Sequence, residues 1–210
     1  MSLVENLNWR YATKKMTGKT IPQEKLQYIL DAAHLAPSSS GLQPYSIIVI
    51  SNKELLEKIK PIAMNQGQIT DASHLLVFAA WNNYTEEKIA GVFDTTVAQR
   101  GLPANTMDEY KDKLWGMYSE KDESWHFNHA SRQAYISFAL AIAAAAEQKV
   151  DATPMEGFNP AALDELLGLN ERGLKSTVIL ALGYRDEPND WLANMKKVRT
   201  PSDRFFIELN

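Results

Sequence analysis

The sequence predicts an α+β fold in which a small mixed sheet lies among many surrounding helices. Segments with helical periodicity dominate, and the short runs rich in β-branched residues are scattered along the chain. Scattered strands among many helices are typical of the α+β class. The predicted strands are 45–51, 74–81 and 176–184, with 204–209 as a candidate fourth strand.

Most predicted helices have a recognisable boundary or an apolar face. The segment 21–37 carries Pro22 near its start, places Leu26, Ile29 and Ala33 on one face, and has Pro37 beyond its end. The other predicted helices are 2–12, 52–60, 85–100, 107–120, 124–148 and one that contains Leu163, Leu166 and Leu167 and ends at Gly168.

Length and composition narrow the class of protein. A chain of 210 residues with 45% hydrophobic side chains can bury one core, so we expect a single domain over residues 1–210. The net charge of −4 argues against a general nucleic-acid binder. The chain has no cysteine, which is consistent with a reducing cytoplasm. The nearly apolar run 134–146 is 13 residues long, too short to span a bilayer, so we expect no membrane partner and a cytoplasmic location.

Two segments carry more apolar side chains than an isolated chain readily covers. The run 134–146 is apolar around most of its helical circumference and therefore needs cover on all sides. The last 25 residues, with Trp191 and the pair Phe205 and Phe206, resemble a tail that packs onto a surface. Both features suit an extensive homodimer, although the core of a well-covered monomer explains the helix equally well.

Two compact basic clusters lie far apart in the sequence of this acidic protein. "RYATKK" contains Arg10, Lys14 and Lys15, and "KKVRTP" contains Lys196, Lys197 and Arg199. Arginine suits bidentate recognition of phosphate, and lysine supplies a point charge. The clusters form either one anion site or two separate solvated surfaces.

Two loops offer polar groups or backbone freedom. "APSSSGLQPY" joins a helix to a strand and presents three hydroxyls, and no G-x-S-x-G elbow marks any of its serines as a nucleophile. "DATPMEGFNP" (151–160) reads as a loop that leads into a helix capped by Asn159 with Pro160 at its first position. Gly157 would let a ligand approach the main chain closely. Each loop is either an ordinary connection or a binding segment.

Other motifs give little support for metal or dinucleotide sites. His126 and His129 are spaced to share one helical face, but no third ligand lies nearby in the sequence, so we expect no metal. The chain has no G-x-G-x-x-G after a strand and no Walker A loop. Trp115 is either a core aromatic or one wall of a flat pocket.

Taken in order along the chain, these stretches resemble the nitroreductase family of FMN-dependent NAD(P)H oxidoreductases, closest to its oxygen-insensitive nitroreductase and dihydropteridine reductase branch. The resemblance covers nearly the whole chain, and "TPMEGF" before a helix start is its most specific piece. The other matching stretches are "RYATKKM", "APSSSGLQPYSIIV", "DASHLLVFAAW" and "KKVRTP". The resemblance implies a nitroreductase-like fold and an intertwined homodimer with FMN in each of two interface sites.

The resemblance also implies a role for each matching position. Arg10, Lys197 and Arg199 would hold the FMN phosphate, and Lys14 would face the N1–O2 edge of the flavin, with Tyr11 and Ala12 on the same segment. Other expected contacts are Asn65 and Gln68 at the ring, the backbone of Pro154, Met155, Glu156 and Gly157 near N5, and Pro37, Ser38, Ser39 and Ser40 from the partner subunit. Ser40 and Trp115 would also meet the substrate.

Three positions depart from the pattern of the family. A histidine–serine pair common in this branch is Tyr11–Ala12 here, Gly41 stands where asparagine is usual, and Gln68 takes the place of a lysine. One fewer cation near N1–O2 should stabilise the anionic reduced flavin less, which makes Lys14 more important.

The reaction implied is reduction of nitroaromatics, quinones or similar flat acceptors by NAD(P)H, in a ping-pong sequence through one open cleft. No catalytic residue is expected beyond the flavin N5 atom, because the cofactor carries the chemistry. The alternatives are a dedicated pteridine, enone or flavin reductase, and a non-catalytic FMN-binding protein.

Overall fold

The computed structural model describes residues 2–209, in which four strands form one sheet of order β1-β2-β4-β3. The strands are β1 (Tyr45–Ile50), β2 (His74–Trp81), β3 (Asp151–Met155) and β4 (Leu174–Gly183). Each neighbouring pair is antiparallel, so the mixed sheet that the sequence predicted is antiparallel in the described residues. The α+β class is confirmed, with helices arranged around a small sheet.

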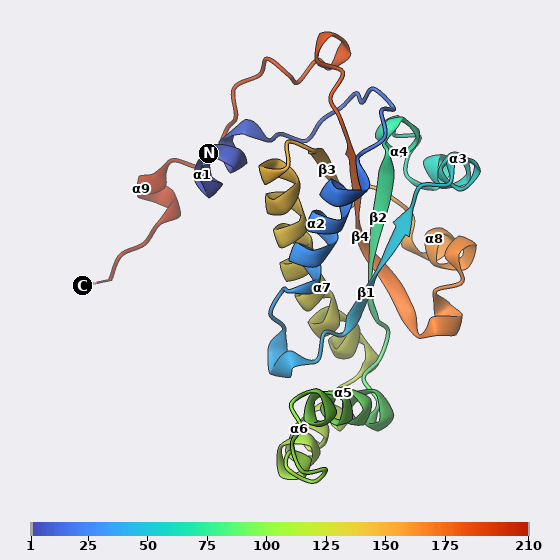
Figure 1. Ribbon diagram of the computed structural model, residues 1–210, viewed down its shortest axis with the longest axis vertical. Coiled ribbons are helices and arrows are strands. Elements are labelled where there is room, and N and C mark those ends of the chain that lie inside the picture. Colours follow the sequence, from blue (N-terminus) through green and yellow to red (C-terminus); the bar gives the residue numbers. More distant parts are fainter. Residues whose placement is uncertain (1, 210) are drawn as a thin grey trace.

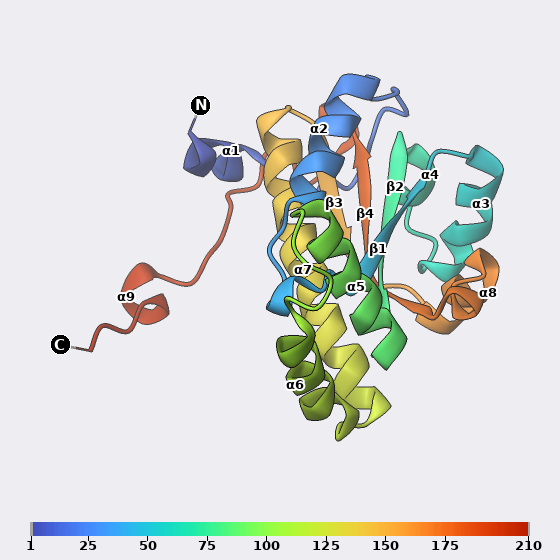
Figure 2. The ribbon, with the colours of Figure 1, turned by 60° about the horizontal axis from the view of Figure 1, so that its bottom comes forward.

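Helices cover both faces of the sheet and extend beyond one end (Figure 1). The long helix α7 and the helix α2 lie on one face, α3, α4 and α8 lie on the other, and α5 and α6 extend past the sheet (Figures 1 and 2). The α-helices are α1 (Leu3–Trp9), α2 (Gln23–His34), α3 (Lys53–Ile62), α4 (Gln68–Asp71), α5 (Glu86–Gln99), α6 (Asp108–Ser119), α7 (Glu123–Glu147), α8 (Pro160–Leu167) and α9 (Ser202–Phe205).

Local chemistry explains where several of these helices begin and end. The Asp122 carboxylate caps α7 by accepting from Trp125 N, and the Asn159 side chain caps α8 by accepting from Ala162 N. Gly168 ends α8 in the left-handed conformation (φ 62°), which glycine adopts without steric cost.

Apolar side chains on both faces of the sheet fill two cores. Under α2 and α7, the rings of Phe78 and Phe138 meet edge to face with centroids 5.2 Å apart, next to the fully buried Ile29. On the other face, Leu56 of α3 and Leu163 of α8 are fully buried against the sheet. Burial of such side chains stabilises a fold by roughly 1.5–3 kcal/mol each.

Two predicted elements were wrong. The segment that begins at Asp151 was predicted as a loop, but residues Asp151–Met155 form β3. Pro154, which has no N–H to donate, is tolerated because β3 is an edge strand that pairs with β4 alone. The candidate strand 204–209 pairs with no described strand, and α9 occupies its start.

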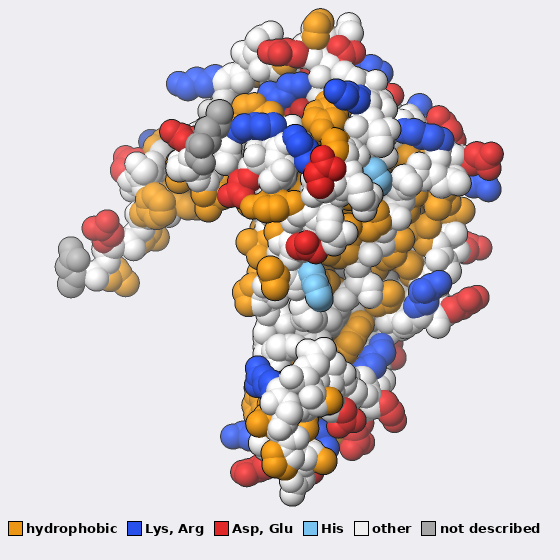
Figure 3. All heavy atoms as spheres, viewed as in Figure 1, with side chains coloured by type: hydrophobic (Ala, Val, Ile, Leu, Met, Phe, Trp, Pro, Cys, Tyr) orange, Lys and Arg blue, Asp and Glu red, His pale blue; other side chains and the backbone are white. Residues whose placement is uncertain are grey.

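The C-terminal arm (residues 200–209) leaves the body of the protein (Figures 1 and 2). Phe205, Phe206, Ile207 and Leu209 are 66–92% exposed, and Figure 3 shows hydrophobic side chains along the arm. None of the helices within residues 2–209 combines the length and the apolar content that crossing a bilayer requires.

Candidate functional site

The N- and C-terminal segments enclose one cavity of about 580 Å³. Arg10 of the first basic cluster and Lys196, Lys197 and Arg199 of the second line it, whereas Lys14 and Lys15 do not. Lys197 Nζ donates to the backbone carbonyl of Arg10 at 2.5 Å and also to that of Leu7, so a residue near the C-terminus fastens the N-terminal segment. The predicted site residues on the cavity wall are Arg10, Tyr11, Ala12, Lys197 and Arg199.

Three cations of this cavity repel one another. Burial lowers the pKa of Arg10, and the nearby Arg199 lowers it further, partly offset by Asp151. Burial likewise lowers the pKa of Lys197, followed by the charges of Arg10 and Arg199. Arg10 Nε is buried and has no hydrogen-bond partner among the described residues. A phosphate group fits this cavity, because its oxygens would accept from the unpartnered guanidinium N–H. Its negative charge would also reduce the repulsion between the cations.

A fourth cation, Arg185, lines the same cavity but is already paired. Its guanidinium donates to the buried Asp151 carboxylate from Nε at 2.8 Å and from Nη2 at 2.6 Å. The rings of Trp9 and Tyr11 contact the guanidinium, with centroids 4.3 and 4.5 Å from its central carbon. This arrangement holds the aromatic residues of the N-terminal segment in place.

The segment that contains Lys14 contacts both the edge strand β3 and the helix α4. Thr153 Oγ1 of β3 donates to the carbonyl of Thr13 at 2.7 Å, which sets Lys14 next to the strand that contains Pro154. The neighbouring cation Lys15 is neutralised by Asp71 at the end of α4, 2.7 Å away. Lys15 therefore belongs to a surface ion pair, whereas Arg10 faces the cavity.

The turn after β3 is held from two sides. Gln66 Nε2 donates to the carbonyl of Gly157 at 2.9 Å, and Tyr135 donates its hydroxyl proton to Glu156 Oε1 at 2.6 Å. A Cβ atom on Gly157 would lie 3.3 Å from the sulfur of Met64 and 3.4 Å from Gln66 Nε2, so the position is tight for any larger residue.

The loop that precedes α4 brings the predicted ring contacts into the same region. Asn65 adopts the left-handed conformation (φ 54°), directly before the Gln66 that holds Gly157, and Gln68 is buried in α4. Four segments thus converge on one side of the molecule: 10–14, 65–68, 153–157 and 190–199.

The serine loop (residues 37–41) and the helix that contains Trp115 lie away from the cationic cavity. Gln43 N donates to Ser38 Oγ, and Ser39 N donates to the buried Gln133, both at 2.9 Å. Ser40, whose φ is 54°, accepts from the Tyr110 hydroxyl of α6, the helix that contains Trp115. This loop follows Pro37 and forms the short turn between α2 and β1 in Figure 1, well away from the N-terminal segment. The structure therefore brings Ser40 and α6 together but does not bring them to the cationic cavity.

The two histidines with helical spacing hydrogen-bond to tyrosines, and both contact Tyr84. His126 Nε2 is 2.8 Å from the carbonyl of Tyr118, and His129 Nδ1 is 2.8 Å from the hydroxyl of Tyr84. Burial lowers the pKa of His129, assisted by the charge of Arg132. Residues 2–209 contain no cluster of acidic, histidine or cysteine side chains that could hold a metal ion.

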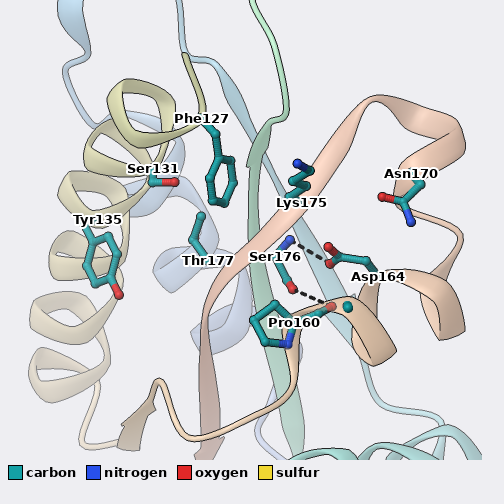
Figure 4. Close-up of a pocket in the computed structure, with 10 residues that line it drawn as sticks. Phe127, Ser131, Tyr135, Pro160, Asp164, Asn170, Lys175, Ser176 and Thr177 are labelled. Carbon is teal, nitrogen blue, oxygen red and sulfur yellow. Dashed lines mark hydrogen bonds between the residues drawn. The ribbon is translucent and has the colours of Figure 1, made fainter. Parts of the chain in front are cut away.

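A second cavity, of about 490 Å³, lies between α7 and the start of β4 (Figure 4). Ser176 N donates to Asp164 Oδ1 at 2.8 Å, which ties α8 to β4 on one wall, and Tyr135 lies on the opposite wall. The predicted cofactor residues do not line this cavity, although Tyr135 connects it to Glu156.

The fold and the site define an α+β protein with a cationic cavity where its N- and C-terminal segments meet. The chain belongs to the nitroreductase family, whose family model matches residues 7–184.

Relatives and solved structures match this chain over 94–100% of its length. A Staphylococcus saprophyticus protein assigned as an NAD(P)H nitroreductase is 30% identical, covering 96% of this chain and 94% of the relative. The major NAD(P)H-flavin oxidoreductase of Aliivibrio fischeri is 28% identical and covers 94% of each chain. A protein of Exiguobacterium sibiricum, solved in complex with FMN, matches with a TM-score of 0.85 and 21% identity, covering 100% of this chain and 98% of that one.

Three residues at the site were not predicted from the sequence. Arg185 and Asp190 bind the N-terminal segment, and Gln66 binds Gly157. Asp190 accepts from Lys14 N at 2.8 Å and is buried. An isolated acid or amide in a loop carries no pattern, so only the folded pairing reveals these roles, across 91 residues for Gln66 and 176 residues for Asp190.

Proposed function

We propose that this protein is an FMN-dependent NAD(P)H oxidoreductase that reduces flat acceptors such as nitroaromatics and quinones. The observation that carries the proposal is the buried, unpartnered Nε of Arg10 inside a cavity shared with Lys197 and Arg199. Membership of the nitroreductase family and the flavin and NAD(P)H named for its relatives support the same reading.

The predicted cofactor residues would divide into a group at the cationic cavity, which holds the phosphate, and a group on the adjoining segments, which holds the ring. Arg10, Lys197 and Arg199 would bind the phosphate. Lys14, with Tyr11 and Ala12 on its segment, would face the N1–O2 edge, while Asn65, Gln68 and the backbone of residues 154–157 would line the ring. When bound, FMN supplies the two-electron chemistry between the donor and the acceptor.

The protein's own groups would place the ring and tune its charge. The turn at Met155, Glu156 and Gly157 is fixed by Gln66 and Tyr135, so its main chain presents a rigid surface to a flat ligand. The Lys14 ammonium would favour negative charge on the N1–O2 side. One open cleft that serves the donor and the acceptor in turn would give ping-pong kinetics.

The proposed active unit is a homodimer. Pro37, Ser38, Ser39, Ser40 and Trp115 would reach the flavin of the partner subunit, which accounts for their distance from the cationic cavity within one chain. Exposed apolar side chains on α1 and on the arm, including Leu3, Val4 and Phe205, supply a surface for such an association.

A paired assay tests the proposal. The purified protein should show the visible absorbance of FMN and oxidise NADH or NADPH faster when menadione or nitrofurazone is added. A protein with bound flavin that oxidises neither nucleotide would be a non-catalytic FMN binder. Turnover confined to one pteridine, enone or free flavin would indicate a dedicated reductase.

A further inference from the structure

Asp190 joins the two ends of the chain at the cationic cavity. It is 3% exposed, and its carboxylate accepts hydrogen bonds from both chain segments that carry the predicted cofactor residues. Oδ2 accepts from Lys14 N at 2.8 Å, from the Tyr11 hydroxyl at 3.0 Å and from Lys15 N at 3.4 Å. Oδ1 accepts from Leu192 N at 2.9 Å, at the start of the segment that leads to Lys197.

These hydrogen bonds hold the carboxylate in its charged form. Burial alone raises the pKa of Asp190, but the N–H groups of Lys14 and Leu192, the Tyr11 hydroxyl and Lys15 N outweigh it, so the pKa lies below the ordinary value. Four protein donors occupy the two oxygens, which leaves little capacity to bind a ligand directly. Asp190 therefore acts on other residues of the site rather than on the cofactor.

Asp190 lies between the two segments that carry the predicted phosphate-binding cations and Lys14, so its hydrogen bonds affect the position of both segments. The N-terminal segment carries Arg10 and Lys14, and the segment after Leu192 carries Lys197 and Arg199. Lys197 also links them, because it donates to the Arg10 carbonyl. Just before Asp190 in the chain, Arg185 contacts the Tyr11 ring and Asp186 N donates to the Lys15 carbonyl at 2.9 Å. Among these contacts, Asp190 is the side chain that binds backbone N–H groups of both segments.

We propose that Asp190 is the positioning residue that sets the phosphate-binding cations and Lys14 at a fixed separation matched to one FMN molecule. This inference rests on the proposed function. It predicts that a substitution of Asp190 changes both the FMN affinity and the reduction potential of the bound FMN. A substitution of Arg199 or Lys14 alone should change mainly one of the two, because each cation serves one end of the cofactor.

Asp190→Asn is the informative substitution. Asparagine has nearly the same shape, but its amide N–H₂ replaces one acceptor oxygen and opposes either the Leu192 N–H or the donors of residues 11–15. We expect FMN affinity to fall about tenfold or more. We also expect the reduction potential of the remaining bound FMN to become more negative, because Lys14 is no longer held beside the N1–O2 edge.

Asp164→Asn is the matched control. Asp164 is also a buried aspartate (4% exposed) that accepts from a backbone N–H, that of Ser176 at 2.8 Å, but it lies at the other cavity. This variant should lower the melting temperature while leaving the FMN dissociation constant and potential unchanged. A second control, Tyr11→Phe, removes one donor to Asp190 and should give a smaller change than Asp190→Asn in the same direction.

Two outcomes would overturn the inference. One is an Asp190→Asn protein that loses only thermal stability, as Asp164→Asn does, with unchanged affinity and potential. The other is unchanged amide hydrogen exchange at Lys14, Lys15 and Leu192 in the flavin-free variant, where the inference requires faster exchange. A wild-type protein that binds no FMN would instead reject the proposed function, and the role of Asp190 toward that cofactor with it.

Discussion

Arg10 shows how one buried side chain can indicate a ligand. A guanidinium whose Nε is buried without a partner costs free energy, and the nearby charges of Lys197 and Arg199 add to that cost. Groups with perturbed pKa values that gather in a cavity often mark a functional site. A bound phosphate dianion would supply the missing acceptor and offset two of the three positive charges.

Arg199→Ala should weaken FMN binding without changing the chemistry of the flavin that remains bound. Loss of a charge-assisted contact costs roughly 1.5–3 kcal/mol, or about ten- to a hundredfold in affinity. Fluorescence titration of the flavin-free protein with FMN and with riboflavin measures this, because riboflavin lacks the phosphate and its affinity should change little. Arg172→Ala, on the exposed 3₁₀ turn Asn170–Arg172, is the control. An unchanged FMN dissociation constant would place Arg199 away from the phosphate.

Lys14→Ala should lower the reduction potential of FMN when the cofactor is kept saturating. At an effective dielectric near ~20, the loss of this cation should cost ~1–2 kcal/mol after solvent compensation. About 1.4 kcal/mol corresponds to about 30 mV for a two-electron couple. Spectroelectrochemistry of wild type and variant measures the shift. Equal midpoint potentials would mean that Lys14 lies on the solvated surface or serves only the phosphate.

At the scale of the elements, the sequence predicted most of the fold because its signals are local. The β-branched runs of β1 and β4, the apolar run of β2 and the caps of α8 lie where the sequence predicted them. Two predicted elements were wrong because their secondary structure depends on which other parts of the protein they contact. Pro154 is compatible with a strand only at a sheet edge, and the apolar run 204–209 indicates burial without identifying the surface that buries it.

The candidate site was predictable only in part. The basic clusters around Arg10 and Lys197 were visible as candidates, and the structure brings them to one cavity. The sequence could not show that Arg185 is paired with Asp151, since that depends on folding distant segments together. The serine loop was predicted to act on a partner subunit, and a single chain leaves that prediction open.

Gly168 tests the account of helix α8. Gly168→Ala places a Cβ in the left-handed conformation at the end of the helix, which should destabilise the protein by roughly 1–2 kcal/mol. Gly91→Ala is the matched control, because Gly91 lies within α5, has a negative φ, and an added Cβ there meets nothing within 4 Å. That variant should gain roughly 0.5–1 kcal/mol. Urea denaturation of both compares them, and equal changes would contradict this reading of α8.

At the scale of the whole molecule, the exposed apolar side chains are the feature that suits a partner subunit. Leu3, Val4, Ile136 and Leu140 are 37–66% exposed on α1 and α7, and the arm adds Phe205 to Leu209. Large apolar side chains that are exposed together usually mark an association site. A second copy of this chain would cover it and would bring the loop at Ser40 to a second cationic cavity.

We therefore predict that the protein purifies as a homodimer with about one FMN per chain. Size-exclusion chromatography with light scattering gives the mass, and absorbance after denaturation gives the flavin content. Removal of residues 200–210 should weaken the dimer, because the arm carries exposed apolar side chains. A monomer that retains its full flavin content would contradict an interface site.

The most direct test of the central claim is an anaerobic titration of the purified protein, followed through the visible absorbance of bound FMN. We predict that NADH or NADPH bleaches the flavin bands, and that menadione added afterwards restores them. The Arg199→Ala protein should behave in the same way only when excess FMN is supplied. A wild-type protein without flavin absorbance after incubation with FMN, or with bands that neither nucleotide changes, would contradict the account.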